Sequence, residues 1–270
     1  MRNERSSDEF DPSVPNVARM YNYGLRGKDN FEADRALAEE MIALVPKARL
    51  IAQENRRFLL KAVQELADQG IRQFLDIGAG FPTEENVHQV ALERAPDSRI
   101  VYVDNDPEVL AHARALLADN PQTIVVDGDL RDPKAILTNP AITAHLDFSQ
   151  PIAVLLAAVL HFIVDDAEAG QIIERIREVL APGSHLVISH SFAGQADERL
   201  REEGLAIYAR TGIGAITART PEQLEGFLHD MEILEPGIIP VEGWRPEWDD
   251  VVPDWATPGL LAVVAKIPTP

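Results

Sequence analysis

The chain has 270 residues, of which 46% are hydrophobic, and it carries a formal net charge of −19. This length fits one domain, or one domain with an appendage, and the apolar content is ample for a sizeable core. The excess of acidic residues repels nucleic-acid backbones and anionic membranes, so we expect neither as a partner.

Two further absences narrow the class of protein. The chain contains no cysteine, which excludes disulfides, thiolate metal sites and a cysteine nucleophile, and we expect no metal site. Residues 1–11 are polar and lack the apolar core of a signal peptide, and no apolar run approaches the ~20 residues that span a bilayer. We therefore expect a cytoplasmic protein.

The first quarter of the chain predicts helices. Residues 1–12 are charged and almost free of apolar side chains, which predicts a disordered tail. Residues 13–70 predict an N-terminal helical cap, with a short helix near residue 20 and longer helices over 31–44 and 47–69. Asn30 is the expected N-cap of the second helix, and Gly70 is the expected stop of the third.

A glycine turn follows this cap. A short apolar strand ends at Asp76, and Gly78 and Gly80 follow at alternate positions before a helix that is expected to begin near Thr83. Two glycines so placed permit a tight turn and let the backbone approach a ligand without an intervening Cβ. Alone, this pattern is also typical of an ordinary strand-to-helix turn.

The next predicted strand supplies an acid. Residues 99–104 form an apolar run that ends at Asp104, which lies 24 positions after Gly80. In dinucleotide-binding βαβ units, the acid that binds the ribose hydroxyls lies about 20 positions after the turn. The order of strand, turn, helix, strand and acid predicts an adenosine site. The alternative is that Asp104 only caps the helix opened by Pro107.

The same residues distinguish between adenosine ligands. A pyrophosphate favours a third glycine three positions after Gly80, where this chain has Thr83. Asp76 would also place negative charge near the turn. Both features favour the sulfonium and ammonium of S-adenosylmethionine over NAD.

Three segments together resemble the motif series of class I S-adenosylmethionine-dependent methyltransferases: residues 76–80, Asp104 and residues 127–130. This likeness covers about residues 70–192. More narrowly, nearly the whole chain resembles a bacterial family of uncharacterised S-adenosyl methyltransferases, through residues 18–21, 27–31, 86–88 and 159–162. Class I enzymes often have a glycine where this chain has Pro82, so the contact to the methionine end is the least securely transferred.

The resemblance implies roles for individual residues. Asp129 would accept a hydrogen bond from the adenine amino group, with Leu130 against the ring; an acidic turn without a ligand is the alternative. The loop after the first helix would be a lid over the methionine end, where Arg19 or Lys28 would pair with the carboxylate, or else an ordinary solvated turn. The expected cofactor-binding set is Tyr21, Lys28, Asp76, Gly78, Ala79, Gly80, Asp104, Asn105, Asp129, Leu130 and Ala158.

A histidine follows the most apolar segment of the chain. Residues 151–160 predict a central parallel strand ending near Ala158, which places His161 at the carboxyl edge of the sheet, where ligands bind in such folds. His161 is therefore the candidate catalytic residue, as a general base for a substrate hydroxyl or amine. The alternative is a structural histidine that shapes the pocket.

The remaining pattern completes the predicted fold. Strands at residues 184–191, 231–234 and 260–266 alternate with helices at 167–180, 196–209 and 220–228. We expect residues 71–270 to form a Rossmann-like, doubly wound α/β domain with a seven-stranded, mostly parallel sheet and an antiparallel last strand. The predicted function is methyl transfer from S-adenosylmethionine to a small molecule. The alternatives are an NAD-dependent oxidoreductase and a cofactor-binding sensor or partner protein without turnover.

Overall fold

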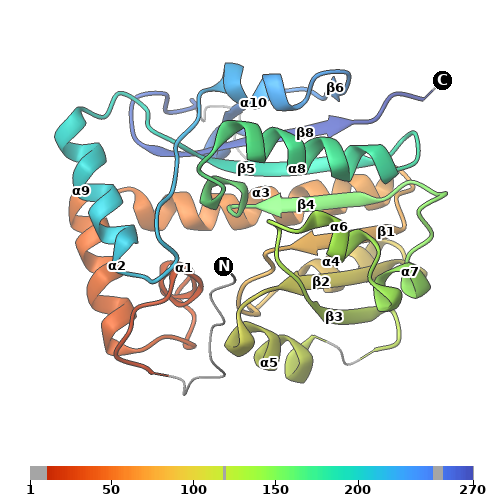
Figure 1. Ribbon diagram of the computed structural model, residues 1–270, viewed down its shortest axis with the longest axis horizontal. Helices are drawn as coiled ribbons and strands as arrows, with labels where there is room; N and C mark the ends of the chain where they lie inside the picture. Colours follow the sequence, from red (N-terminus) through yellow and green to blue (C-terminus); the bar gives the residue numbers. More distant parts are fainter. Residues whose placement is uncertain (1–10, 118–119, 246–251, 270) are drawn as a thin grey trace.

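A computed structural model describes residues 11–117, 120–245 and 252–269 of the chain, so most of the predicted tail lies outside the described residues. Its centre is a sheet with the strand order β3-β2-β1-β4-β5-β8-β6, and β7 also pairs with β8 (Figure 1). The strands are β1 (Gln73–Ile77), β2 (Arg99–Asp104), β3 (Thr123–Asp127), β4 (Ala153–Ala157), β5 (His185–Phe192), β6 (Glu232–Ile233), β7 (Ile239–Pro240) and β8 (Gly259–Lys266).

The described residues form a sheet of eight strands, so the predicted count of seven is wrong by one. The additional strand arises at the edge beside β8, where both β6 and β7 pair antiparallel with β8. Pro236 and Gly237 lie between these two short strands. Because proline has no N–H to donate and glycine weakens a strand, the edge is divided into two pieces.

The parallel part of the sheet is as predicted. β1 pairs in parallel with β2 and β4, β2 with β3, and β4 with β5, whereas β8 runs antiparallel to β5. The residues of β4 are almost all apolar and fully buried through Leu156, as expected for a central strand with both faces covered. The carboxyl ends of β1 to β5 therefore lie along one edge.

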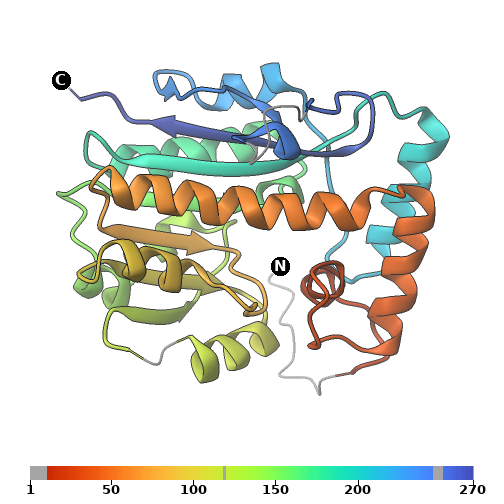
Figure 2. The same cartoon turned by 180° about the vertical axis from the view of Figure 1, so that it is seen from behind.

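Helices cover both faces of the sheet. The helices are α1 (Val17–Gly24), α2 (Glu32–Leu44), α3 (Ala48–Asp68), α4 (Val87–Arg94), α5 (Pro107–Leu116), α6 (Pro133–Leu137), α7 (Pro140–His145), α8 (Asp166–Val179), α9 (Glu198–Ala209) and α10 (Pro221–Phe227), with short 3₁₀ turns η1 (Leu160–Phe162) and η2 (Val241–Gly243). α8 crosses the face seen in Figure 1, and α3 runs along the opposite face, seen in Figure 2. Among the described residues, no helix has the length and apolar character to cross a membrane.

Two helices begin at different residues from those predicted. Asn86, rather than Thr83, is the N-cap of α4, because residues 83–86 form a turn in which the Asn86 side chain accepts from the Thr83 N–H at 3.0 Å. α2 has Phe31 as its N-cap. Asn30 is instead buried, and its amide donates to Asn22 Oδ1 at 2.8 Å.

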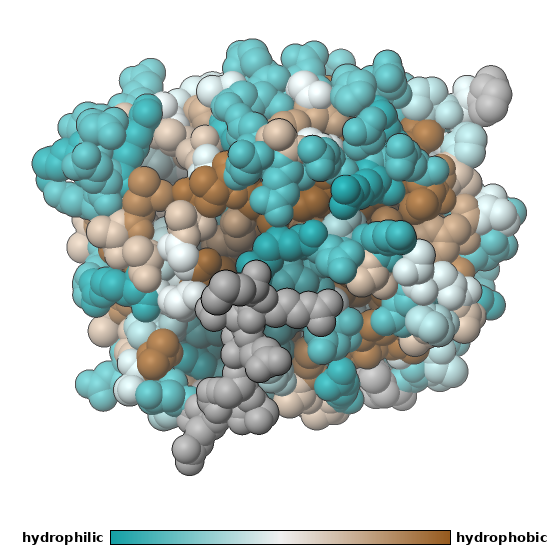
Figure 3. Space-filling view, viewed as in Figure 1, coloured by the Kyte–Doolittle hydropathy of each residue, from teal (hydrophilic) through white to brown (hydrophobic). Residues whose placement is uncertain are grey.

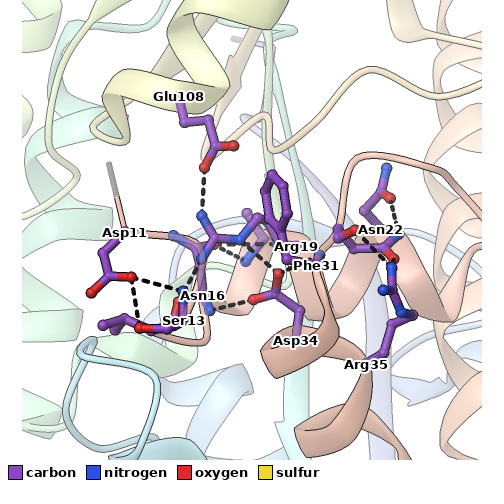
Figure 4. A network of polar contacts seen from close by, with 12 residues as sticks. Asp11, Ser13, Asn16, Arg19, Asn22, Phe31, Asp34, Arg35 and Glu108 are labelled. Atoms are coloured by element: carbon purple, nitrogen blue, oxygen red, sulfur yellow. Dashed lines mark hydrogen bonds and ion pairs between the residues drawn. The ribbon is translucent and has the colours of Figure 1, made fainter. Parts of the chain in front are cut away.

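α1, α2 and α9 form a separate group beyond the carboxyl ends of the parallel strands (Figure 1). Met20, Leu37 and Ile207 join the three helices in a small apolar cluster. Arg19 of α1 connects this group to α5: it is 4% exposed, its Nε pairs with Asp34 of α2 at 2.8 Å, and its Nη1 pairs with Glu108 of α5 at 2.6 Å (Figure 4). The two ion pairs of Arg19 therefore hold α1 against α2 and α5.

Candidate cofactor and acceptor site

The glycine turn after β1 depends on both of its glycines, for different reasons. Gly78 and Gly80 have φ of +78° and +65°, in the left-handed region that side chains rarely adopt. A Cβ on Gly78 would lie 2.6 Å from Val159 Cγ2, whereas a Cβ on Gly80 would have no atom within 4 Å. Gly78 is thus required by packing, and Gly80 leaves space beside the turn.

Asp104 lies beside this turn. Its Oδ2 accepts from the Gly80 N–H at 2.9 Å, and its Oδ1 accepts from the Asp106 N–H at 3.0 Å. The helix cap of α5 is Asp106, whose carboxylate accepts from the Glu108 N–H at 2.8 Å. Burial raises the pKa of Asp104, and the hydrogen bonds from Gly80 and Asp106 oppose this rise. Asp104 therefore organises the turn rather than capping α5.

Asp76 is a buried acid at the start of the turn, with 3% of its surface exposed. Burial raises its pKa from 3.8 to about 7; the nearby Arg56 of α3 opposes the rise, and the charge of Asp104 adds to it. A carboxylate in this position gains from any cation placed beside it, since such a cation offsets the cost of burying its charge.

Asp129 lies just after β3. Its carboxylate forms an ion pair with Arg131 at 2.6 Å and accepts from the Asn105 amide at 3.2 Å. Burial acts to raise the pKa of Asp129, but the hydrogen bonds and charge of Arg131 lower it overall. The neighbouring Leu130 is buried and lines the same cavity as Asp129. Asn105, Asp129 and Leu130 are thus brought together, and Arg131 was not anticipated from the sequence.

The cap contributes a second set of polar groups. The Tyr21 hydroxyl donates to the Ala52 carbonyl at 3.2 Å and accepts from the Asn55 amide at 2.8 Å. Asn55 Oδ1 and Arg56 Nε are buried and have no hydrogen-bond partner among the described residues. Lys28, in contrast, is exposed in the loop before α2 and is not among the cavity-lining residues.

Asn55 and Arg56 were missed because they lie within the long amphipathic helix α3, where polar residues usually face solvent. The sequence signal was weak: a buried asparagine inside a helix differs from a solvated one only through its tertiary contacts. The structure places both residues at the cavity wall, on the side of Asp76.

The carboxyl end of β4 supplies Ala158 and His161. Ala158 has φ of +54°, and its N–H donates to Ser189 Oγ at 2.9 Å. His161 is 5% exposed, and its Nδ1 has no partner among the described residues. Burial lowers the pKa of His161 well below its usual value, and His190 and Arg219 add to this effect. The imidazole is therefore neutral near pH 7.

A buried pair stands behind His161. Arg219, which is 1% exposed, donates from Nη1 to His190 Nε2 at 2.9 Å and pairs with Asp166 at 2.8 Å. His190 Nδ1 then donates to the Ser191 carbonyl at 2.9 Å, so both ring nitrogens of His190 are engaged in its neutral form. These contacts fix the inner wall of the site.

All the candidate residues except Arg19 and Lys28 line one cavity of about 860 Å³. It extends from the carboxyl edge of the sheet to α1, α2 and α9 and to the loop over residues 211–218. Figure 3, viewed from the same side as Figure 1, shows hydrophobic residues gathered in the middle of that face of the molecule. Ligand pockets usually measure about 300–1,000 Å³, so this cavity is large enough for a nucleoside and a second small molecule.

Comparison with known proteins identifies the family of the chain. The model of a family described as S-adenosyl methyltransferases matches residues 3–268. A candidate methyltransferase from Thermobifida fusca YX is 40% identical, with a TM-score of 0.86 over 95% of this chain and 96% of its own. A DUF574 family protein from Streptomyces avermitilis MA-4680 is 36% identical, with a TM-score of 0.87 over 96% of this chain and 99% of its own.

A curated relative matches only a short segment. The ribosomal RNA small subunit methyltransferase H of Halorhodospira halophila is 40% identical over 57 residues, which are 21% of this chain and 18% of that protein. The family match and the two similar structures, in contrast, extend over almost the entire chain. The chain therefore belongs to the family of S-adenosyl methyltransferases, enzymes whose methyl donor is S-adenosylmethionine.

Proposed function

We propose that this methyltransferase modifies a small molecule that binds beside S-adenosylmethionine in the cavity. The observation that carries the proposal is the make-up of the cavity: polar and acidic groups at the sheet edge continue into an apolar chamber beneath α1, α2 and α9. A chamber closed by helices suits a small molecule that can be surrounded by protein. It is poorly suited to a polymer, and the net charge of −19 disfavours nucleic acid.

The residues at the sheet edge fit the cofactor. Asp104 Oδ2 accepts from the Gly80 N–H and Oδ1 from the Asp106 N–H, and because a carboxylate has about four lone-pair sites, it can also accept from the ribose hydroxyls. Asp76 and the unpartnered Asn55 Oδ1 would hold the ammonium group, and Arg56 would hold the carboxylate. Asp129 and Leu130 would contact the adenine. The open space beside Gly80 admits the chain that joins them.

S-adenosylmethionine supplies an electrophilic methyl group: a lone pair of the acceptor forms the new bond to carbon while the carbon–sulfur electrons return to sulfur. The work of the protein is then alignment and exclusion of water. The Ala158 turn and His161 form the inner wall, and the Thr217 N–H donates to the His161 carbonyl at 2.9 Å, which holds the 211–218 loop over the chamber. His161 would meet the acceptor as a neutral hydrogen-bonding group.

Calorimetry tests the cofactor assignment. We expect S-adenosylhomocysteine to bind with measurable heat and NAD to give none. Heat with NAD alone would favour the oxidoreductase alternative and contradict the proposal.

Transfer of a labelled methyl group tests the acceptor. The enzyme is incubated with labelled S-adenosylmethionine and cell extract, and the products are separated into small molecules, protein and nucleic acid. We expect label in the small-molecule fraction. Label in a polymer fraction would contradict the proposal, and cofactor binding with no labelled product in any extract would favour the sensor alternative.

A further inference from the structure

The cavity lining is divided by charge. Its acidic side chains all lie in or directly after β1, β2 and β3: they are Asp76, Asp104, Asp106 and Asp129. The lining contributed by α1 to α3, η1, the end of β5, α9 and the 211–218 loop contains three arginines and His161 but, among the described residues, no acid. We call this second part of the lining the acceptor half. Basic residues outnumber acidic ones in it, whereas the chain as a whole has 44 acidic and 25 basic residues.

From this division we infer that the acceptor is an apolar acid, a small molecule with a hydrophobic body and an anionic group that binds Arg201 of α9. The inference rests on the proposed function and deepens it by naming the class of acceptor. An anion in the acceptor half meets guanidinium groups without a competing carboxylate, and an arginine fork matches a carboxylate or similar oxyanion.

Arg201 is the arginine best suited to this role. Its Nε donates to the Ala196 carbonyl at 3.0 Å, which orients the side chain, and it forms no ion pair with any described residue. The other two arginines in this part of the lining have other partners: Arg49 pairs with Glu39 at 3.1 Å, and Arg56, which donates to Thr83 Oγ1 at 2.8 Å, is assigned above to the carboxylate of the cofactor. Arg201 therefore has guanidinium donors left for a ligand.

The surroundings of Arg201 suit an apolar body. The cavity that Arg201 lines is also lined by the apolar residues Phe162, Phe192, Leu200, Leu205, Ile213 and Ile216. Gly204, one turn beyond Arg201, also lines the cavity, and a Cβ at this position would lie 3.9 Å from Leu44 Cδ2 of α2. The absence of a side chain at Gly204 thus keeps space open between α9 and α2.

The inner end of the chamber also disfavours a cationic acceptor. His161 lies there, with its ring 5.7 Å from that of His190, and Arg219 carries a buried positive charge directly behind His190. A protonated amine at this wall would meet no carboxylate of the acceptor half. An anionic or neutral group has no such penalty.

A pair of dyes that differ by one sulfonate group tests the inference. We use 8-anilino-1-naphthalenesulfonate and its neutral counterpart N-phenyl-1-naphthylamine, with fluorescence titration of the full-length protein at saturating S-adenosylhomocysteine. The wild-type protein should bind the sulfonate more tightly. Arg201→Glu should weaken sulfonate binding by about tenfold or more, as expected for loss of a charge-assisted contact, and change binding of the neutral dye by less than about twofold.

Arg199→Glu is the matched control, because it makes the same charge change on the same helix at an exposed residue that does not line the cavity. It should leave both dyes unaffected. Equal binding of the two dyes to the wild type, or equal loss of sulfonate binding in the two variants, would overturn the inference.

Gly204→Leu tests whether the dyes enter the chamber. It should weaken the binding of both dyes. Because leucine is a better helix former than glycine, it should not unfold α9. Unchanged binding of both dyes in this variant would also overturn the inference. Calorimetry with S-adenosylhomocysteine on the wild type and every variant separates the two proposals. If the wild type does not bind S-adenosylhomocysteine, the proposed function is wrong. If it binds S-adenosylhomocysteine but shows no preference for the sulfonate dye, only the assignment of an acidic acceptor is wrong.

Discussion

The backbone N–H of Gly80 donates a 2.9 Å hydrogen bond to Oδ2 of Asp104, although the two residues lie 24 positions apart. The parallel pairing of β1 with β2, in which Ile77 is opposite Val103, brings the glycine turn and the acid to the same edge. The contact fixes the carboxylate before any ligand arrives, which reduces the entropic cost of binding.

Replacement of Asp104 by alanine should weaken binding of S-adenosylhomocysteine by roughly 1.5–3 kcal/mol, the range for hydrogen bonds to a charged group. Isothermal calorimetry measures the change. Asp127→Ala is the control, since Asp127 is an exposed acid opposite Asp104 in the β2–β3 register and does not line the cavity. Equal affinities in the folded Asp104 variant and the wild type would remove Asp104 from the site.

Alanine at the two turn glycines should have different effects. Gly78→Ala should destabilise the fold, because the new Cβ lies 2.6 Å from Val159 Cγ2 at a positive φ. Gly80→Ala should reduce the free energy of unfolding only by the strain of the left-handed backbone, about 1–2 kcal/mol. Its Cβ would occupy the open space beside the turn, so it should weaken cofactor binding. Thermal melts and calorimetry on both variants distinguish the effects; a more severe loss of stability in Gly80→Ala would contradict this assignment.

Cofactor affinity should rise with pH around neutrality. The pKa of Asp76 is raised from 3.8 to about 7, and the ionised form is the one that attracts a cation. Affinity for S-adenosylhomocysteine should therefore be highest above pH 7 and fall as the pH drops below it, by up to about tenfold per pH unit. The Asp76→Asn variant should bind weakly and show no such dependence; an identical pH profile in both proteins would contradict the role of Asp76.

The same shift predicts a stability change in the ligand-free enzyme. Because the folded-state pKa of Asp76 is raised, its contribution is fully present below pH 3.8 and is lost as the pH rises through about 7. At pH 8 the wild type should be less stable than Asp76→Asn by about 2 kcal/mol or more, since one pKa unit corresponds to about 1.4 kcal/mol. Denaturant unfolding at pH 5 and pH 8 measures the difference, which should be smaller at the lower pH.

Loss of Arg19 should loosen the cap. Arg19→Met leaves Asp34, which has a fully buried side chain, without its cation, and breaking such a pair costs about 3–5 kcal/mol. Arg210→Met is the control: Arg210, the C-cap of α9, pairs with Glu40 of α2, but both side chains are about half exposed, so the expected cost is about 0–1 kcal/mol. Denaturant unfolding should rank Arg19→Met well below Arg210→Met, and similar stabilities would contradict this account.

His161 should remain neutral across the working pH range. Burial, followed by the charges of His190 and Arg219, lowers its pKa well below 6.5. Its ring signals, identified by NMR from their loss in His161→Gln, should not shift between about pH 8 and pH 6, whereas an exposed histidine titrates there. A shift centred in this range would instead support the general-base role predicted from the sequence.

Features that depend on neighbours along the chain could be predicted from the residues alone. A few consecutive residue types predict where a strand ends, as in the apolar run of β4, the turn with Gly78 and Gly80, and the acid at Asp104. The parallel strands then bring those ends together. These local patterns, with the family likeness, gave the fold and the cofactor, because backbone geometry restricts where glycine, proline and acids are stable.

Which polar side chains face the cavity, in contrast, depends on how the helices and strands pack together. From the sequence, Arg19 and Lys28 were equal candidates to pair with the carboxylate of the cofactor. In the structure, Arg19 forms ion pairs with Asp34 and Glu108, and Lys28 lies outside the cavity. Arg201 and Asn55 gave no sequence signal, since an arginine or asparagine on an amphipathic helix is ordinary. Their surroundings come from segments far apart in the chain, so whether such a side chain reaches the cavity depends on those segments rather than on the residue itself.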